Sequence, residues 1–398
     1  MVDLIKIILV LLLIIILLRL KWHIGIVMCI GALFLAILYL MPPEKVLKTT
    51  YKSLTSSMSL KLLLALSFIR SFELILREKG LLSRITEATG SILRKRRFVI
   101  ISMPLLIGML PSLGGAYFSA PMVEDSSKGL NLSSEHKAYL NYWFRHPWEL
   151  ILPLYPGIVL ASAVTDIPLR RLILINLPVA IGMVLMGFFI GLRNINGNMD
   201  KGDAMPGIKE VFVPLIPIIV VIGGVAIFGI ELYQILVATL IGLCIFYKES
   251  LQGIGRLLKY GFSKDVFLLI AGVVLIKGMM EASGAVEGLD RYFLESGVPV
   301  ILIAFIMPFI AGLLTGLVVG FIGSTFPLLI AMAGQDISLL SFAFVSGYAG
   351  VLLSPVHLCL VLTREYFKAD MIGIYRRLFP GIIVMLIVSV VIYGAIKS

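Results

Sequence analysis

Long apolar stretches separated by short polar connections run through the whole chain and predict membrane-spanning helices. About 20 apolar residues in a helix cross the hydrocarbon core of a bilayer. The first half contains six such stretches, at 4–18, 22–41, 62–76, 98–120, 150–163 and 172–192. The second half contains six more, at 211–228, 232–247, 266–280, 298–333, 339–362 and 379–396. Both halves therefore have the same number of apolar elements in the same order.

The two halves also share sequence. Residues 62–120 resemble residues 266–324, which lie 204 positions later, and the proline at Pro104 recurs at Pro308. Repeats with breaks at matching positions in a hydrophobic chain are typical of secondary transporters, whose binding sites lie between the repeats.

The loops that follow the third stretch of each half carry opposite charge. Residues 77–97 contain seven basic and two acidic residues, a net charge of +5, whereas the equivalent residues 281–301 contain one basic and four acidic residues, a net charge of −3. Because basic loops stay on the cytoplasmic side, equivalent loops are expected on opposite faces of the membrane. The sequence thus predicts two inverted repeats, residues 1–200 and 205–398, with the N-terminus outside.

An inverted repeat needs an odd number of crossings, so one of the six elements in each half must enter and leave on the same side. The fourth element is the candidate, because Pro111 interrupts one copy and Gly316 the other. Backbone groups freed at such a break cannot face lipid. We expect re-entrant hairpins at about 98–128 and 300–333. The predicted fold is an all-α polytopic membrane protein with five crossings and one hairpin per repeat.

A broken helix is expected after each hairpin, at about 145–163 in the first half and 339–362 in the second. Each contains a proline, Pro147 or Pro355, which removes a helical hydrogen bond and frees a carbonyl group. Half-helix N-termini at such breaks favour anions, and freed carbonyls favour cations. A broken helix that faces a hairpin tip would form a polar pocket.

Ionisable and polar residues near these breaks are the candidates for the site. Glu149 and His357 occupy equivalent repeat positions, and we expect them to bind a coupling ion, Na⁺ or H⁺. The alternative is structural, since Glu149 can pair with Arg145 and a histidine can be satisfied in a core. The residues expected to contact substrate are Ser112, Gly114, Gly115, His146, Thr315, Gly316, Ser324, Thr325, Ser354 and His357. The hydroxyl groups among them can instead bond their own helices, and His146 and Ser354 can serve as helix caps.

Composition agrees with a bilayer as the solvent. Hydrophobic residues make up 59% of the chain, charged residues 14%, and the mean hydropathy is +1.04, against about 45–50% and 25% in soluble domains. The net charge of +11 comes largely from basic residues at the ends of apolar stretches, so no nucleic-acid partner is expected. Cys29, Cys244 and Cys359 have no metal-ligand spacing and are interpreted as core residues. We expect no cofactor and no metal other than Na⁺.

Two inverted halves, each with a hairpin and a broken helix, resemble the ion transporter superfamily. It includes gluconate permeases, citrate and dicarboxylate symporters and some Na⁺/H⁺ antiporters. Within it the chain is most similar to gluconate-permease relatives and to an integral-membrane family named domain of unknown function 401. The symporters carry a Ser-Asn-Thr signature at both tips, where this chain has Ser112 and Gly114, and Thr315 and Gly316. The resemblance implies a homodimer whose early helices form a scaffold for a mobile transport domain.

These features predict a secondary active transporter of the cell membrane that moves a small organic anion, a carboxylate or a sugar acid, by alternating access. Two alternatives stay open: a Na⁺/H⁺ antiporter without organic substrate, and a membrane scaffold or intramembrane enzyme. The sequence has no phosphate-binding Gly-rich loop, no His-Glu-x-x-His motif and no Gly-x-Ser-x-Gly elbow. We therefore expect neither an enzyme nor a nucleotide-driven pump, and the expected partners are the small anion and the lipid.

Overall fold

Helices form the regular structure of the described part of the chain. The computed structural model describes residues 2–81, 95–111, 115–193, 195, 208–285 and 298–397. The helices of the first half are α1 (Val2–Arg19), α2 (Ile24–Leu38), α3 (Pro43–Leu54), α4 (Ser57–Glu78), α6 (Arg96–Gly108), α7 (Gly115–Ser126), α8 (Ser134–Trp143), the 3₁₀ turn η1 (Pro147–Leu150), α9 (Pro156–Thr165) and α10 (Leu169–Gly191). Those of the second half are α11 (Ile208–Ala226), α12 (Leu232–Phe246), α13 (Leu251–Gly261), α14 (Lys264–Ser283), α16 (Val300–Thr315), α17 (Val318–Ala333), α18 (Ile337–Leu353), α19 (Leu358–Phe367) and α20 (Met371–Lys397).

The described helices of the two halves correspond in order. Helices α1 to α4 match α11 to α14, and α6 to α10 match α16 to α20. Contacts between the halves also come in matching pairs: α2 packs on α14 as α12 packs on α4, and α9 packs on α17 as α19 packs on α7. The same holds for α8 on α20 and α18 on α10, while α10 and α20 pack on each other. The pattern of contacts stays the same when the two halves are exchanged, as expected for halves related by a twofold axis.

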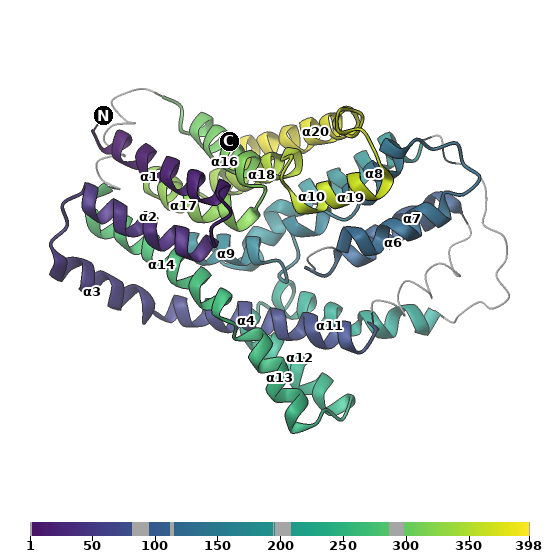
Figure 1. Cartoon of the computed structure of the whole chain (residues 1–398), viewed down its shortest axis with the longest axis horizontal. Coiled ribbons are helices and arrows are strands. Elements are labelled where there is room, and N and C mark those ends of the chain that lie inside the picture. Colours follow the sequence, from purple (N-terminus) through teal and green to yellow (C-terminus); the bar gives the residue numbers. More distant parts are fainter. Residues whose placement is uncertain are drawn as a thin grey trace.

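Helix α18 lies at the centre of the molecule. Every residue from Ser338 to Leu353 is buried, and the helix packs against α16, α17, α10 and α20. The pair α6 and α7 and the pair α16 and α17 lie on opposite sides of this centre (Figure 1). Each pair consists of two short helices that pack against each other. Polar side chains on α18 therefore lie deep in the protein.

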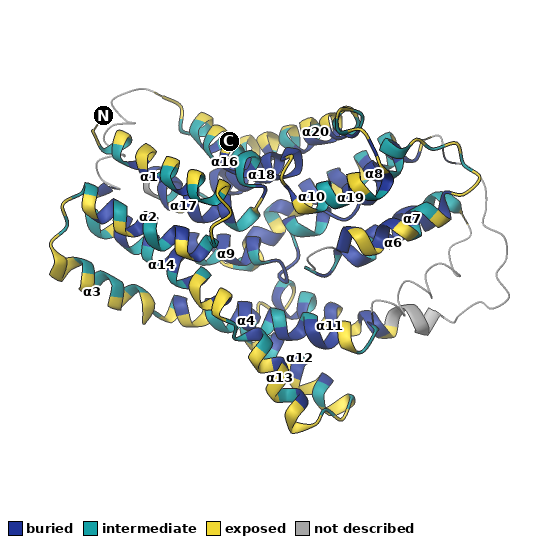
Figure 2. Ribbon diagram, in the orientation of Figure 1, coloured by how far each residue is buried: buried dark blue, intermediate teal, exposed yellow. Residues whose placement is uncertain are grey.

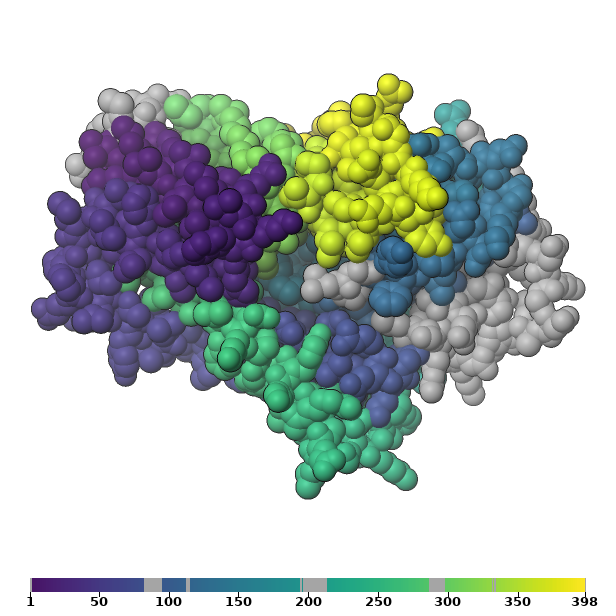
Figure 3. All heavy atoms as spheres, viewed as in Figure 1, coloured from purple at the N-terminus to yellow at the C-terminus, as the bar shows by residue number. Residues whose placement is uncertain are grey.

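The outer surface is apolar over several helices. Exposed residues are frequent on α1 and α20 (Figure 2), and many of them are large hydrophobic residues, among them Ile5, Ile8, Leu12, Ile16, Ile383, Ile387 and Val391. In the space-filling view the N-terminal helix and C-terminal residues of the chain lie on the same face (Figure 3). Apolar surface of this extent needs a partner other than water. A lipid environment is compatible with it.

Four helical stretches of the described chain are long and apolar enough to cross a membrane: Leu169–Gly191, Leu251–Ser283, Ile337–Phe367 and Met371–Lys397. Several other apolar helices are shorter, among them α2, α12 and the two helices of the α16–α17 pair. The structure therefore supports an all-helical membrane protein. The ten crossings and the re-entrant course of the hairpins stay predictions.

Three helices were not expected from the apolar stretches. Helix α3 has no buried residue and α13 only three, so both are amphipathic helices that lie outside the core. They occupy equivalent positions in the two halves. Helix α8 carries polar residues such as His136 and Asn141 and therefore has no long apolar run that would predict it. The stretches 98–120 and 298–333, conversely, are each divided into two helices.

Candidate functional site

Two interrupted segments, one from each half, meet at the centre of the protein. In the first, α8 ends at Trp143 and α9 begins only at Pro156, with the turn η1 between them. In the second, α18 ends at Leu353 and α19 begins at Leu358. Proline lacks the N–H group that would continue a helix; the first interruption contains Pro147 and Pro153, and the second contains Pro355.

Tyrosines from opposite halves hold the interruptions together. The hydroxyl of Tyr348 on α18 donates a hydrogen bond of 2.7 Å to the carbonyl of His146. In return, the hydroxyl of Tyr142 on α8 donates one of 3.1 Å to the carbonyl of Leu352. All of these groups are buried. Each break thus has a carbonyl group satisfied by the opposite half, which removes the cost of leaving it unpaired in the interior.

His146 and His357 face each other inside this arrangement. Their Nε2 atoms are 3.2 Å apart. The Nδ1 atom of His146 lies 2.5 Å from the carbonyl oxygen of Tyr142, and the Nδ1 atom of His357 lies 2.9 Å from that of Gly316. A carbonyl oxygen only accepts hydrogen bonds, so each Nδ1 must carry the proton. In the neutral rings both Nε2 lone pairs therefore point at the same small volume.

Three further ionisable side chains border this volume. The nearer carboxylate oxygen of Glu149 lies 3.7 Å from Nε2 of His146. The thiol of Cys359 lies close to both histidines, since its sulfur and the ring nitrogens of His146 and His357 lie within 4.8 Å of one another. Arg145 is 3% exposed, and its guanidinium interacts electrostatically with Cys359 and Glu149. We call His146, Glu149, His357, Cys359 and Arg145 the central cluster.

Each interruption also contacts the helix pair of its own half. In the first half the indole N–H of Trp148 donates to the carbonyl of Leu105 at 2.7 Å, and the hydroxyl of Tyr155 donates to the carbonyl of Gly108. In the second half the contact is the hydrogen bond from His357 to Gly316. The central cluster is therefore positioned by both helix pairs and by both breaks.

The structure brings some of the predicted site residues together and leaves others apart. His146, Glu149, His357 and Gly316 meet at the central cluster, and the buried Ser354 lies close to Gly316. Thr315, Ser324 and Thr325 each donate a hydrogen bond of 2.7 Å to a carbonyl of their own helix, which is the structural alternative for these hydroxyls. Gly115 begins α7 and is buried. Ser112 and Gly114 lie outside the described residues.

Sequence reasoning missed Cys359 as a member of the cluster. It was interpreted as a core residue, yet it lies beside His146 and His357. The spacing His357-x-Cys359 directly after a helix-breaking proline was the available signal. The position of His146 relative to them depends on contacts between residues more than 200 positions apart, which no local spacing reveals.

Two buried asparagines were also missed. The side chain of Asn141 donates to the carbonyl of Ala116 at 2.9 Å and to the hydroxyl of Thr363 at 3.2 Å, and so joins α8 to α7 and α19. The side chain of Asn176 on α10 accepts a hydrogen bond of 2.7 Å from Ser341 on α18. Such fully paired amides fix helices relative to one another in a low-dielectric interior. We assign these two residues a structural role.

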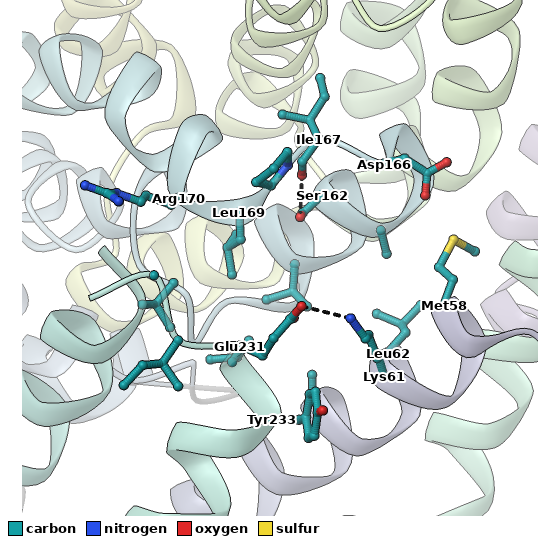
Figure 4. Close-up of a pocket in the computed structure, with 18 of the residues that line it drawn as sticks. Met58, Lys61, Leu62, Ser162, Asp166, Ile167, Leu169, Arg170, Glu231 and Tyr233 are labelled. Atoms are coloured by element: carbon teal, nitrogen blue, oxygen red, sulfur yellow. Dashed lines mark hydrogen bonds and ion pairs between the residues drawn. The ribbon is translucent and has the colours of Figure 1, made fainter. Parts of the chain in front are cut away.

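A separate cavity of about 430 Å³ lies between α4, the connection from α9 to α10 and the start of α12. Lys61 and Glu231 form an ion pair of 2.8 Å in it, while Asp166 and Arg170 also line it (Figure 4). The hydrogen bond and charge of Glu231 raise the pKa of the Lys61 ammonium group above its ordinary value. None of the lining residues belongs to the central cluster.

Helix α9 links the cavity to the cluster. Its residues Val159 and Ser162 line the cavity, while Tyr155, its N-cap residue, donates to the carbonyl of Gly108 beside the first interruption. The cavity is partly charged and open, whereas Arg145, His146 and His357 of the central cluster are buried and Glu149 and Cys359 are half-buried.

Comparison with known proteins identifies one family. The model of the family described as Protein of unknown function (DUF401) matches residues 2–396. Among curated proteins no match to the chain is found. Since the family match covers nearly every residue, the chain belongs to the DUF401 family.

Proposed function

We propose that the protein is a secondary active transporter of the cell membrane that moves a small organic anion, coupled to Na⁺ or H⁺. The observation that carries the proposal is the meeting of two interrupted segments, one from each half, at a largely buried cluster of ionisable side chains. Charged groups are costly inside a membrane protein and mark solute or ion pathways. Broken helices at a repeat interface are where secondary transporters bind their solutes.

The proposed membrane arrangement is an inverted repeat. The matching contacts between the halves support a twofold relation, and the opposite charges of residues 77–97 and 281–301 support opposite orientations. In this arrangement the α6–α7 and α16–α17 pairs are the re-entrant hairpins of an ion-transporter-type fold. The homodimer that this resemblance implies belongs to the same proposal.

An anionic solute fits the charges around the central cluster. Arg145 supplies a buried positive charge. The N-terminus of α19 begins directly after His357, and that of α17 begins two residues after Gly316. Helix N-termini carry partial positive charge and unsatisfied N–H groups that favour carboxylates. Glu149 supplies the negative charge that a coupling cation requires.

The cavity beside α9 supplies a route for the solute. It is lined by the basic residues Lys61 and Arg170 and the acidic residues Asp166 and Glu231, and it borders α9, whose N-cap residue Tyr155 bonds to Gly108 beside the first interruption. In alternating access a buried site opens to one side at a time. We assign the described arrangement to a state in which the cluster is closed and the cavity is open.

Counterflow in proteoliposomes tests this function. Purified protein would be reconstituted and loaded with unlabelled short carboxylates or sugar acids, and uptake of the labelled compound would be measured while Na⁺ and pH are varied. We expect exchange of at least one anion that depends on Na⁺ or on pH. Uptake of Na⁺ that depends on pH without any anion exchange would support the antiporter, and no flux of either kind would refute transport.

Glu149→Gln tests the coupling site. Removing the negative charge should lower ion-dependent uptake at least about tenfold, equivalent to about 1.4 kcal/mol, while exchange that needs no ion gradient persists. Glu44→Gln on the exposed face of α3 is the matched control and should behave like the unmodified protein. Unchanged ion dependence in Glu149→Gln would remove Glu149 from the coupling mechanism.

A further inference from the structure

We infer that His146, His357 and Cys359 form a binding site for a divalent metal ion of the zinc class. Two imidazole nitrogens and a thiolate are ligands that Zn²⁺ and Co²⁺ bind, and the three ligand atoms lie within 4.8 Å of one another. The inference depends on the geometry of these side chains and not on transport.

The spacing of the histidines fits a tetrahedral metal. With metal–nitrogen distances of about 2.0–2.1 Å, two nitrogen ligands of a tetrahedral ion lie about 3.3 Å apart. The Nε2 atoms of His146 and His357 are 3.2 Å apart. An ion bound by both would thus require little movement of either ring.

Hydrogen bonds already hold both rings in the metal-binding tautomer. Metal-binding histidines usually donate the N–H of their other ring nitrogen to a carbonyl or carboxylate, which fixes the ring and raises its basicity. His146 donates from Nδ1 to the carbonyl of Tyr142, and His357 donates from Nδ1 to the carbonyl of Gly316. Both Nε2 lone pairs are thereby directed toward the same point.

Glu149 is placed to supply a fourth ligand. Its carboxylate oxygen lies 3.7 Å from Nε2 of His146, a distance suited to neighbouring ligands of one ion. On binding, the Cys359 thiol loses its proton to solvent, and the thiolate and the Glu149 carboxylate together balance the charge of the metal. Arg145 then remains as a positive charge beside the metal centre, where an anion could bind.

The donor set selects among metals. Nitrogen and sulfur ligands bind Zn²⁺ and Co²⁺, whereas Na⁺, Mg²⁺ and Ca²⁺ prefer oxygen. Pro355, Val356 and Leu358, next to His357 in the second interruption, are exposed. Since His146 comes from one half and the other two ligands from the other, a bound metal would join the halves at their interruptions.

Cobalt titration of the purified full-length protein in detergent tests the site. We expect one Co²⁺ per chain, with the thiolate-to-metal absorption band and the intense visible bands of a tetrahedral site, and with displacement by Zn²⁺ but not by Mg²⁺ or Ca²⁺. Cys359→Ser should abolish the thiolate band, and His357→Gln should weaken binding at least about tenfold. Cys244→Ser and His23→Asn are matched controls at positions away from the cluster and should leave the spectrum unchanged.

A second measurement avoids substitutions in the cluster. In the double variant Cys29→Ser, Cys244→Ser, Cys359 is the remaining thiol of the three, and Zn²⁺ should slow its alkylation by N-ethylmaleimide. Absence of the thiolate band, its persistence in Cys359→Ser, or an alkylation rate that does not respond to Zn²⁺ would each overturn the inference. Because neither measurement involves flux, a negative counterflow result would leave the metal site standing, and the reverse also holds.

Discussion

Gly316, beside the central cluster, is a position where the structure leaves no room for a side chain. Its φ of +64° lies in the left-handed region, and a Cβ atom there would lie 2.9 Å from the backbone nitrogen of His357. Its carbonyl also accepts the hydrogen bond that orients the ring of His357. Both the conformation and the space at this position therefore require a residue without a side chain.

We predict that Gly316→Ala destabilises the protein and disturbs the cluster. The left-handed conformation alone costs an alanine about 1–2 kcal/mol, and the contact with His357 adds to that cost. The thermal unfolding midpoint in detergent should fall. Gly242→Ala on α12, where a Cβ would meet no atom within 4 Å, is the control and should be neutral or slightly stabilising. Equal midpoints for the two variants would contradict this assignment.

At the level of single residues, the sequence indicated which residues come together but not which of them are in contact. The proline breaks and the repeat alignment pointed to His146, Glu149 and His357, whose side chains the structure brings together; their role stays a prediction. The alignment matched His146 with Ser354 and Glu149 with His357, but the histidines are the pair in contact. Spatial neighbours across two halves depend on how the helices cross, and a repeat alignment gives equivalent positions, not contacts.

Among the elements, α16 and α18 approach each other unusually closely. A Cβ atom on Gly312 would lie 2.2 Å from the carbonyl oxygen of Gly347, and one on Gly350 would lie 2.1 Å from that of Phe309. Small residues at such crossings allow helix backbones to pack tightly within membranes. The first half repeats the feature, because a Cβ on Gly108 would lie 2.4 Å from the carbonyl oxygen of Arg145.

We predict that Gly312→Ala and Gly108→Ala both destabilise the protein, because each added methyl group meets backbone that cannot move aside. Overpacking of this kind costs about 1–3 kcal/mol. Unfolding midpoints and monodispersity in detergent would measure the loss. Gly255→Ala on the peripheral helix α13, which has open space around it, is the control. A normal midpoint in both test variants would show that these helix pairs tolerate separation.

Element prediction from the sequence succeeded where apolarity is continuous and failed where it is not. The stretches 172–192 and 232–247 correspond closely to α10 and α12. Helices α3 and α13 were missed because an amphipathic helix on the surface has no long apolar run. Helix α8 was missed because its buried polar groups are satisfied by other helices, for example His136 by the carbonyl of Gly191.

At the scale of the whole molecule, the relation between the halves rests on matching contacts. The order of elements follows from the sequence repeat, whereas the packing of α2 on α14 and of α4 on α12 depends on which helix faces meet. Nothing in either sequence copy specifies that choice. The contacts between the halves do not define how each half is oriented in the membrane; the charge of the loops indicates that orientation.

Arg77 and Glu281 occupy equivalent positions at the ends of α4 and α14, and we predict that they lie on opposite sides of the membrane. Arg77→Cys and Glu281→Cys would be introduced separately into a chain in which Cys29, Cys244 and Cys359 are replaced by serine. A membrane-impermeant thiol reagent should label Arg77→Cys from the cytoplasmic side and Glu281→Cys from the other, in right-side-out and inverted vesicles. The parent without cysteine controls for background, and labelling of both from one side would exclude inverted repeats.

The crossed tyrosine bonds described above have a consequence for motion. Tyr348 of the second half is bonded to the first interruption, and Tyr142 of the first half is bonded to the second. Displacing either interruption breaks a bond that the opposite half supplies and leaves a buried hydroxyl and a buried carbonyl unsatisfied. Each interruption is therefore held by a hydrogen bond that the opposite half supplies, and displacing either one leaves unpaired polar groups in both halves.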